Sequence, residues 1–228
     1  MDTNTMSQPI FPCYSDSGRK KNTMLLHLAT YCNTQCNFCF RSQIAGLSAG
    51  MNRMDSAIMT PESAIDLVSI KVESGNPPAS VEIGGPGEPL LFASTYAVLR
   101  ALRNRYPDIE LSVWTNGLLL ADRLEELVRS GIKHLTVSVN AAIPETAAQI
   151  YNGLIYRVRK YSAEDSAALL LHRQWGGIKN AVEAGVFVTI YSMIIEGVND
   201  NDLPLVASRA RELGVDHMIC SRPIQRSQ

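Results

Sequence analysis

Three closely spaced cysteines are the strongest chemical feature of this sequence. Cys32, Cys36 and Cys39 lie within one short run, Cys-Asn-Thr-Gln-Cys-Asn-Phe-Cys. Thiolates are the usual ligands of iron–sulfur clusters, and three of them bind three of the four irons of a [4Fe–4S] cluster. The fourth iron is then open to a small chelating molecule. We therefore expect a [4Fe–4S] cluster with one reactive corner.

A zinc site is the main alternative for the same cysteines. His27 lies five residues before Cys32, and three cysteines with one histidine are a common ligand set of structural zinc. Closed zinc sites usually take their ligands from two separated pairs, whereas these residues lie on one strand and the loop that follows it. Iron and zinc contents of protein purified without oxygen would distinguish the two metals.

A glycine-rich turn follows a second apolar run. The segment reads Ile83-Gly84-Gly85-Pro86-Gly87-Glu88-Pro89. Glycines let a ligand approach the backbone closely, and the Glu88 carboxylate could accept a hydrogen bond from an ammonium group. We expect Gly84, Gly85 and Glu88 to contact a cofactor; the alternative is a turn without a binding role.

Small polar residues close two further apolar runs. Thr115 and Asn116 end one run, and Ser138 and Asn140 end the next. Such side chains suit ribose hydroxyls or a carboxylate, although they also cap and form turns routinely. We take the four residues as further candidates for cofactor contacts.

Short apolar runs alternate with helical patterns along the whole chain. The expected strands are Met24–Thr30, Ser80–Gly84, Glu110–Thr115, His134–Asn140, Val186–Ile195 and Asp216–Cys220. The expected helices are Pro61–Glu73, Leu90–Arg105, Ala121–Ser130, Ala163–Ala184 and Asp202–Leu213. Thr60 before Pro61 is a typical helix start. Helices typically end in glycine, and here three glycines follow helical runs: Gly131, Gly185 and Gly214.

This alternation predicts a parallel sheet in an α/β fold. Six strand–helix units suit a partial (β/α)6 TIM-like barrel, with a doubly wound open sheet as the competing layout. In either case the chemistry belongs at the carboxyl ends of the strands. Residues 23–228 would form this single domain, preceded by an extension, residues 1–22, that carries Cys13. A long loop, residues 40–60, follows the cysteines.

Composition narrows the class of protein. The net charge of −1 and the isoelectric point near 6.4 lack the basic excess of most nucleic-acid binders. No apolar run reaches the roughly 20 residues that span a bilayer, and the first residues lack the layout of a signal peptide. We expect a cytoplasmic protein that binds neither nucleic acid nor membrane. One basic group, Arg157, Arg159 and Lys160, could meet an anionic substrate.

The cysteine spacing resembles the signature of the radical S-adenosylmethionine (SAM) superfamily. In that superfamily the cysteine loop follows the first strand of a partial barrel, as Cys32 follows the expected strand Met24–Thr30. The resemblance implies an enzyme that binds SAM at the open iron and cleaves it reductively to a 5′-deoxyadenosyl radical. It also implies that Phe38 lies near the adenine, that the turn at Gly84 and Gly85 holds the methionine amino group, and that the segment 196–200 approaches the adenine.

The chain is most similar to one branch, the radical-SAM domain of the nitrogenase iron–molybdenum cofactor maturase (NifB-like) family. The similarity covers roughly residues 11–220. It is carried by the cysteine loop and by five further stretches: Pro12–Tyr14, Gly85–Leu90, Thr115–Leu118, Ile150–Val186 with Arg173, Gln174 and Gly177 inside it, and Gly197–Asp200. The resemblance implies an oxygen-sensitive enzyme of metallocluster biosynthesis.

That family holds additional iron–sulfur clusters, and the ligands of one of them match this sequence in part. Cys13 and His27 match two of its ligands, which implies a second cluster, whereas the third falls at Ser112. A hydroxyl is a far poorer iron ligand than a thiolate. Phe11 also replaces a histidine of the family, and its C-terminal Cys-x-x-Cys has no counterpart here. Cys220 could serve as a substitute ligand or be a simple buried thiol.

The sequence is therefore compatible with several functions. The chain could be a maturase-like enzyme, a diverged enzyme acting on a small molecule or peptide, a non-catalytic iron–sulfur carrier or scaffold, or a zinc protein. A radical-SAM enzyme implies a one-electron donor such as ferredoxin or flavodoxin. A role in metallocluster synthesis further implies a protein that donates or accepts iron–sulfur clusters.

Overall fold

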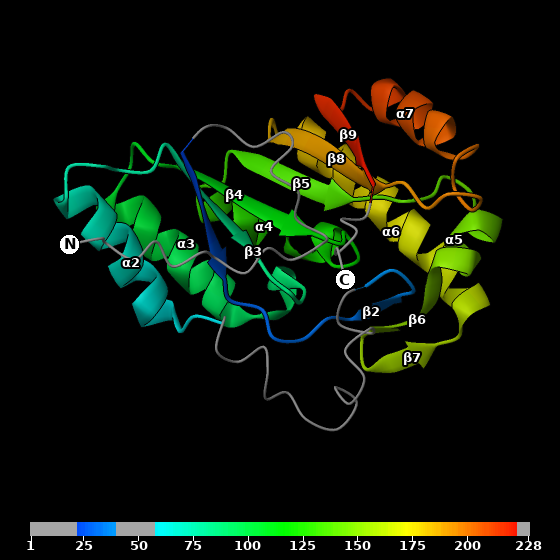
Figure 1. Cartoon of the computed structure of the whole chain (residues 1–228), viewed down its shortest axis with the longest axis horizontal. Helices are drawn as coiled ribbons and strands as arrows, with labels where there is room; N and C mark the ends of the chain where they lie inside the picture. The colour runs from blue at the N-terminus through cyan, green and yellow to red at the C-terminus, as the bar shows by residue number, and fades with distance from the viewer. Residues whose placement is uncertain (1–21, 40–57, 223–228) are drawn as a thin grey trace, which may run out of the picture.

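A six-stranded parallel sheet forms the centre of the molecule. The computed structural model describes residues 22–39 and 58–222. The strands are β1 (Thr23–His27), β3 (Ser80–Gly84), β4 (Glu110–Thr115), β5 (His134–Ser138), β8 (Phe187–Met193) and β9 (His217–Ser221). They lie in the order β1-β3-β4-β5-β8-β9, and every neighbouring pair is parallel (Figure 1). The predicted parallel sheet is confirmed.

The order of the strands also decides between the two predicted layouts. A doubly wound sheet reverses its strand order at a switch point, because its two halves wind in opposite directions from the middle. Here the order never reverses, so each crossover moves one strand further in the same direction. This is the winding of a (β/α) barrel, and six parallel strands make the partial barrel that we expected.

Helices join successive strands of the sheet. They are α2 (Pro61–Glu73), α3 (Ala93–Arg105), α4 (Leu120–Arg129), α6 (Ala163–Glu183) and α7 (Leu203–Glu212). The Thr60 hydroxyl accepts a hydrogen bond from the Ser63 amide, as the predicted helix start requires. The three glycines expected at helix ends have φ values between 73° and 83°, in the left-handed region that favours glycine. One expected helix, Leu90–Arg105, is wrong at its start: a 3-10 turn, η2 (Pro89–Leu91), and the extended Phe92 precede α3.

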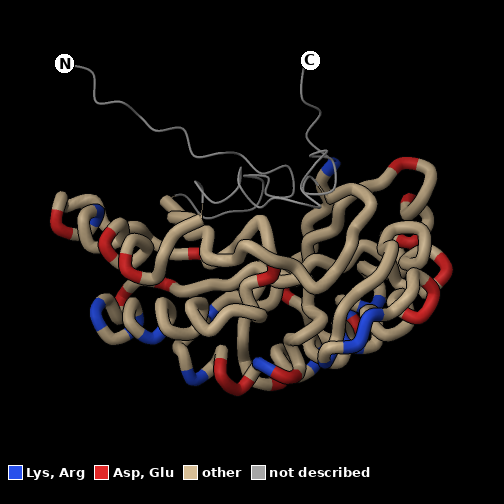
Figure 2. The backbone as a smooth tube through the Cα atoms, turned by 90° about the horizontal axis from the view of Figure 1, so that it is seen from below, with Lys and Arg blue, Asp and Glu red and all other residues tan. Residues whose placement is uncertain are grey.

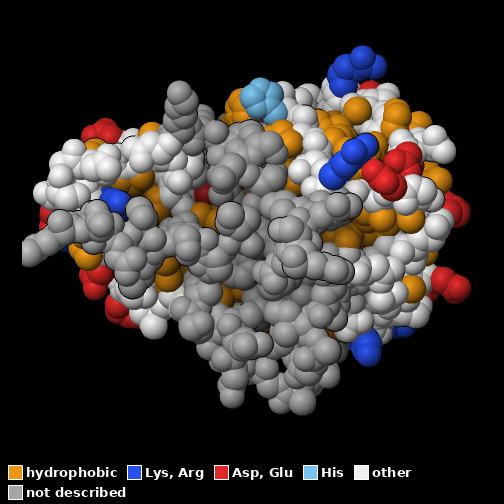
Figure 3. Space-filling view, in the orientation of Figure 1, with side chains coloured by type: hydrophobic (Ala, Val, Ile, Leu, Met, Phe, Trp, Pro, Cys, Tyr) orange, Lys and Arg blue, Asp and Glu red, His pale blue; other side chains and the backbone are white. Residues whose placement is uncertain are grey.

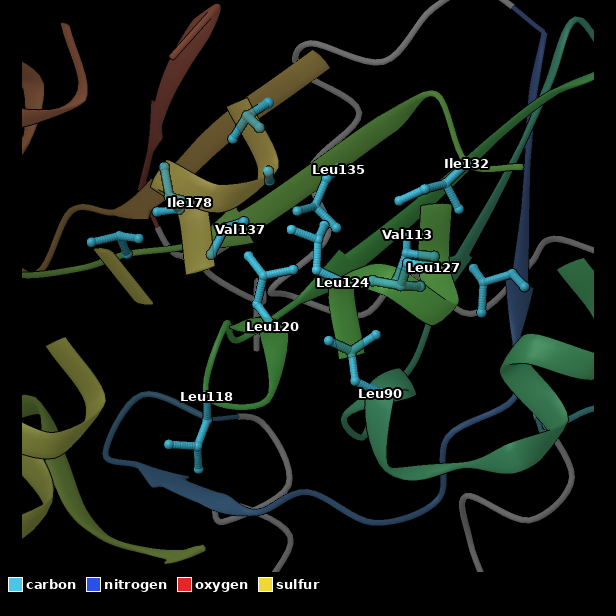
Figure 4. Packing of buried hydrophobic residues seen from close by; sticks show 14 of the residues in the cluster. Leu90, Val113, Leu118, Leu120, Leu124, Leu127, Ile132, Leu135, Val137 and Ile178 are labelled. Carbon is cyan, nitrogen blue, oxygen red and sulfur yellow. The ribbon is translucent and has the colours of Figure 1, made fainter. Parts of the chain in front are cut away.

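The two faces of the sheet differ in chemistry. Side chains alternate along each strand, and one set is mostly apolar and packs on the helices. Figure 4 shows strand residues of this set, Val113, Leu135 and Val137, near Leu120 and Leu124 of α4. The alternate set is mixed: it holds polar residues together with a smaller apolar cluster of Leu25, Trp114, Tyr191 and Met193. The alternate set lines the inner face of the partial barrel.

A second, smaller sheet was missed from the sequence. Its antiparallel strands are β2 (Thr34–Cys36), β6 (Tyr151–Tyr156) and β7 (Arg159–Tyr161), in the order β2-β6-β7. A short helix, α5 (Pro144–Ile150), leads into it. The new sheet matters for the site because β2 contains one of the three clustered cysteines.

Positions of Lys and Arg alternate with positions of Asp and Glu along the described backbone (Figure 2), and Figure 3 shows side chains of both signs toward the margins of one face. None of the helices in the described ranges is both long and apolar enough to cross a membrane. The predicted N-terminal extension with Cys13, and residues 40–57 of the predicted long loop, lie outside the described residues.

Candidate functional site

The cysteine loop is held in place by the small sheet. Cys36 pairs with Tyr151 across β2 and β6, and the Ile155 amide donates to the Asn33 carbonyl at 2.8 Å. The Asn37 amide donates to the Ile150 carbonyl, also at 2.8 Å. The loop is therefore anchored by backbone on both sides of its middle cysteine, although two of its cysteines lie outside regular structure.

The three sulfurs are accessible and can be approached by polar hydrogens. Cys32, Cys36 and Cys39 are half-buried and form no disulfide. The Thr34 hydroxyl lies 3.3 Å from the Cys32 Sγ and 3.8 Å from the Cys36 Sγ. Hydrogen bonds from hydroxyl and amide groups stabilise thiolates that ligate iron. The loop thus offers three thiols outside any disulfide, two of them close to the Thr34 hydroxyl, which fits a [4Fe–4S] cluster.

The zinc alternative requires one convergent ligand set. Within the ranges 22–39 and 58–222, no group of three His, Cys, Asp or Glu side chains converges on a single ion position. A [4Fe–4S] cluster differs in this respect, because each thiolate binds a different iron and the sulfurs stand further apart.

Glu88 joins the glycine-rich turn to the end of β4. Its carboxylate accepts hydrogen bonds from the Thr115 hydroxyl at 2.6 Å, the Asn116 amide at 2.7 Å and the Leu90 amide at 3.0 Å. The side chain is 1% exposed, and burial raises the pKa of Glu88 to about 7 against the lowering effect of these donors. We expected Glu88 to accept a hydrogen bond from a cofactor ammonium; the structure shows it serving other parts of this chain.

The glycines of the turn accommodate the segment that precedes the first cysteine. The Gly87 amide donates to the Ala29 carbonyl at 3.0 Å, and the Glu88 amide donates to the Tyr31 carbonyl at 2.8 Å. A Cβ atom on Gly87 would lie 2.2 Å from the Tyr31 oxygen, and one on Gly85 would lie 2.7 Å from the Ala29 Cβ. The close approach that these glycines permit is therefore made, in the structure, by the Tyr31 backbone and the Ala29 side chain.

Asn116 connects the end of β4 directly to the cysteine loop. Its Nδ2 lies 2.7 Å from the Asn33 Oδ1, 3.2 Å from the Thr34 hydroxyl and 3.6 Å from the Cys32 Sγ. Its Oδ1 accepts a hydrogen bond from the Leu118 amide at 3.0 Å. Both ends of the amide are used, so Asn116 fixes the turn and the cysteine loop to each other.

The polar residues at the end of β5 are also committed to internal contacts. The Asn140 Nδ2 donates to the Tyr151 hydroxyl at 2.9 Å, and its Oδ1 accepts from the Met193 amide at 2.8 Å. The Ser138 hydroxyl accepts from the Trp114 indole N–H at 2.8 Å. Because Asn140 is 2% exposed and Ser138 only half-buried, Ser138 is the better placed of the two for a ligand.

A stripe of three residues on α6 lies over the turn between β4 and α4. The Gln174 Nε2 donates to the Asn116 and Ser138 carbonyls, both at 2.8 Å, and the Arg173 Nε donates to the Leu118 carbonyl at 3.2 Å. Gly177 packs so closely that an added Cβ would lie 2.8 Å from the Leu120 Cβ. The sequence places these residues in a stretch that carries the family resemblance, but it indicates no role for them. These contacts hold the turn that carries Asn116 against α6.

Tyr151 is a second residue whose role the sequence did not indicate. It is 3% exposed and lies beside Cys36 in the small sheet. Burial, reinforced by the negative charge of a nearby Cys36 thiolate, raises the pKa of the Tyr151 hydroxyl. The tyrosine thus stays neutral and links the end of β5 to the cysteine loop through Asn140. The adjacent Ile150-Tyr151 motif was the available signal, but it lay in a segment without a predicted strand.

The other predicted residues lie around this network. Gly84 ends β3 beside His27, and Phe38 is half-buried against both apolar clusters. His27 is 3% exposed and shares a sheet face with Ser112, whose hydroxyl donates to the Val81 carbonyl at 3.4 Å. Of the two alternatives given for Cys220, the buried thiol is wrong, because the residue is exposed on β9. Cys13 lies outside the described residues.

Comparisons with known proteins agree with this geometry. The family model described as the radical SAM superfamily matches residues 26–210. The "FeMo cofactor biosynthesis protein NifB" of Klebsiella pneumoniae is 35% identical over 205 residues, which are 89% of this chain and 44% of that protein. The chain thus spans less than half the length of this curated relative.

Solved structures show the same fold at low sequence identity. Streptococcus suis SuiB aligns with a TM-score of 0.65 at 16% identity, over 90% of this chain and 40% of that chain. The enzyme anSMEcpe with bound AdoMet aligns with a TM-score of 0.57 at 16% identity, over 89% of this chain and 51% of that chain. These alignments support the partial barrel.

Proposed function

The chain belongs to the radical SAM superfamily, and within it we propose that this enzyme acts on an iron–sulfur precursor of a nitrogenase cofactor. Enzymes of the superfamily use a [4Fe–4S] cluster and SAM, and the matched residues 26–210 include all three loop cysteines. We propose this class of substrate because the chain is 35% identical to NifB. The match to less than half of NifB's length leaves the rest of that protein's activity outside this proposal.

Three thiols and their donors would hold the cluster. Cys32, Cys36 and Cys39 would each bind one iron, while the Thr34 hydroxyl and the Asn116 amide orient the Cys32 sulfur. When bound, the cluster supplies one electron to the sulfonium of SAM. The surrounding protein then has two tasks, to orient the cofactor and to exclude competing reactions.

The contacts to SAM are proposed from residues at the carboxyl ends of β3 and β5 and from the cysteine loop. The backbone at Gly84 and Gly85 and the half-buried Ser138 remain candidates, and Phe38 is placed to cover an adenine from the apolar side. We propose that Glu88, Thr115 and Asn140 act mainly by positioning, because their side chains bond to other parts of the chain. Asn116 would position Cys32.

The inner face of the partial barrel carries an apolar cluster beside buried polar residues. Leu25, Trp114, Tyr191 and Met193 form an apolar cluster there, with Phe38 against it. Next to this cluster the same face carries polar residues, among them His27 and Ser112. We propose that a second iron–sulfur cluster is bound on this side through His27 and Cys13.

We further propose a ferredoxin or flavodoxin as electron donor, and a separate protein that donates or accepts iron–sulfur clusters. A low-potential donor and reduced thiols both fit a cytoplasmic enzyme.

Two measurements test these proposals. After anaerobic reconstitution, incubation with dithionite and SAM should yield 5′-deoxyadenosine, and its absence would count against the whole proposal. More than four irons per chain, lowered by Cys13→Ala but not by Cys220→Ala, would support the second cluster. Four irons per chain, unchanged by Cys13→Ala, would reject it.

Ser112 favours a second candidate, a diverged enzyme acting on a small molecule or peptide. Its hydroxyl stands where the resembled family has a thiolate and is bonded to the Val81 carbonyl. If the second cluster site is present but weakened, Ser112→Cys should raise the iron content and stabilise that cluster. An unchanged iron content would favour the small-molecule or peptide substrate.

A further inference from the structure

The hairpin of β6 and β7 ends in an unusual turn. Arg157 and Val158 form its two-residue loop, and both have positive φ values, 48° and 68°. Such turns normally use Asn and Gly, because a β-branched residue is strained in this region. Val158 is also 99% exposed, so no packing accounts for it. An exposed, strained apolar residue at a hairpin tip indicates a role outside the folded chain.

Cationic side chains surround this apolar tip. Arg157, Arg159 and Lys160 are all exposed. The two arginines lie over the rings of Tyr156 and Tyr161, with guanidinium-to-centroid distances of 5.2 and 4.9 Å. These contacts order the guanidinium groups without neutralising them.

Among the residues that the structure describes, Asp122 is the acidic side chain that forms an ion pair with the hairpin. Asp122 lies 3.7 Å from the Arg157 guanidinium, but its other oxygen is paired with Arg173 at 2.6 Å. Glu164 and Asp165 lie in the first turn of α6, just beyond β7. The tip itself therefore remains positively charged.

The hairpin belongs to the same sheet as the cysteine loop. The Ile155 amide donates to the carbonyl of Asn33, which directly follows Cys32. Val158 is three residues further along, which is at most about 10 Å at the usual rise of a strand. Two more exposed apolar side chains lie on these segments, Ile155 and Tyr31. A protein bound at the tip would therefore lie close to the Cys32 side of the loop.

We propose that this hairpin docks a small acidic one-electron carrier protein, with Val158 as the apolar contact and Arg157, Arg159 and Lys160 as the cationic rim. The inference rests on the proposed function, because a radical-SAM enzyme takes an electron from outside. In the docked complex the reduced carrier loses one electron, the cluster bound by the cysteine loop accepts it, and no proton or bond is exchanged. An apolar contact ringed by charge is the usual design of interfaces that are steered electrostatically.

Charge reversal tests the surface in the intact, reconstituted enzyme. The test variant is Arg157→Glu, Arg159→Glu and Lys160→Glu together. The matched control, Lys71→Glu with Arg105→Glu and Arg211→Glu, changes the net charge equally on exposed residues of other helices. For each protein, 5′-deoxyadenosine formation is measured once with fully reduced acidic flavodoxin and once with dithionite.

We expect the test variant to lose at least tenfold in the flavodoxin-driven rate at low salt, while its dithionite-driven rate equals that of the native enzyme. The control should keep both rates. Added salt should slow the native enzyme with flavodoxin and reduce its advantage over the variant. Val158→Gly provides a second variant that relieves the turn while removing the apolar contact, so it should fold at least as well and still lose flavodoxin-driven rate.

Three results would overturn the inference. Equal loss in test and control variants would show an effect of net charge alone. Loss of the dithionite-driven rate in the test variant only would show that the hairpin serves the substrate or cofactor instead. Absence of 5′-deoxyadenosine from the native enzyme with dithionite would remove the proposed function, and the docking site with it.

Discussion

The side-chain amide of Asn116 donates to the sulfur of Cys32 at 3.6 Å, and so ties the end of β4 to a loop 84 residues earlier in the chain. The same residue receives a hydrogen bond at its carbonyl from Gln174 and donates its backbone amide to Glu88. Gln174 and Glu88 thus hold the backbone of Asn116, and its side-chain N–H groups donate to the cysteine loop. Hydrogen bonds to ligating sulfurs are among the factors that set the reduction potential of a cluster.

We predict that Asn116→Ala makes the reduction potential of the bound cluster more negative. Removing an N–H donor leaves more electron density on the Cys32 sulfur, which favours the oxidised cluster. The substitution should also destabilise the fold by roughly 1–3 kcal/mol, because Asn33 and Leu118 lose buried partners. Redox titration followed by electron paramagnetic resonance measures the first effect, and urea unfolding measures the second.

Asn180→Ala on the exposed side of α6 serves as the control and should change neither the potential nor the cluster. A potential that stays the same in Asn116→Ala would show that the contact to Cys32 has only a structural role.

The raised pKa of Glu88 predicts how the free energy of unfolding depends on pH. Its pKa rises from 4.5 to about 7 in the folded protein, because the buried carboxylate is desolvated. Between these values the folded state holds a proton that the unfolded state has lost. The contribution of Glu88 to stability is therefore complete below pH 4.5 and falls as the pH rises through 7, by roughly 3 kcal/mol over the whole window.

Glu88→Gln should remove this dependence. The difference in unfolding free energy between native protein and variant, measured in urea at pH 5, 6, 7 and 8, should be largest at pH 5 and shrink toward pH 8. A difference that grows with pH would mean that the three hydrogen-bond donors outweigh burial and lower the pKa instead.

The cysteine loop yields a third prediction. Replacing Cys36 by Ser should abolish stable binding of the loop's [4Fe–4S] cluster, because a hydroxyl replaces the central thiolate. The exposed Cys220 offers a matched control, and Cys220→Ser should leave iron content and visible absorbance unchanged. Loss of iron in both variants would assign Cys220 to a cluster, and loss in neither would exclude Cys36 as a ligand.

The parallel sheet was predictable because its strands carry local signals. Apolar runs such as Ser80–Gly84 and Glu110–Thr115 are bounded by turn residues, and both strands have the predicted bounds. The small sheet was not predictable in this way. Its strand Thr34–Cys36 has three residues, too few for any pattern, and is specified by pairing with a segment more than 100 residues later.

The candidate site shows the same division. Residue types and spacing identified the cysteines, the glycine-rich turn and the Thr-Asn-Gly turn. They could not identify the bonding partners, because these depend on how the turns meet in space. Gly87 is the clearest case: the sequence predicts a close approach, but only the fold shows that Tyr31 makes it. Asn140 likewise reads as a ligand contact until its buried bonds to Tyr151 and Met193 are seen.

Two adjacent glycines in α6 supply the last prediction. Gly176 and Gly177 share the same helical backbone, so alanine gives both the same gain in helix propensity, about 1 kcal/mol. An added Cβ on Gly176 would meet nothing within 4 Å, whereas one on Gly177 would lie 2.8 Å from the Leu120 Cβ. Overpacking of this kind typically costs 1–3 kcal/mol. Gly176→Ala should therefore stabilise the protein and Gly177→Ala should destabilise it, as measured by urea unfolding of the two variants side by side.

Gly177 lies where α6 packs against the start of α4. A clash there should also move Gln174 away from the Asn116 carbonyl, so cluster binding should weaken only in Gly177→Ala. Equal stabilities would mean that α6 can shift away from α4 at no cost, and that it does not hold the turn that carries Asn116.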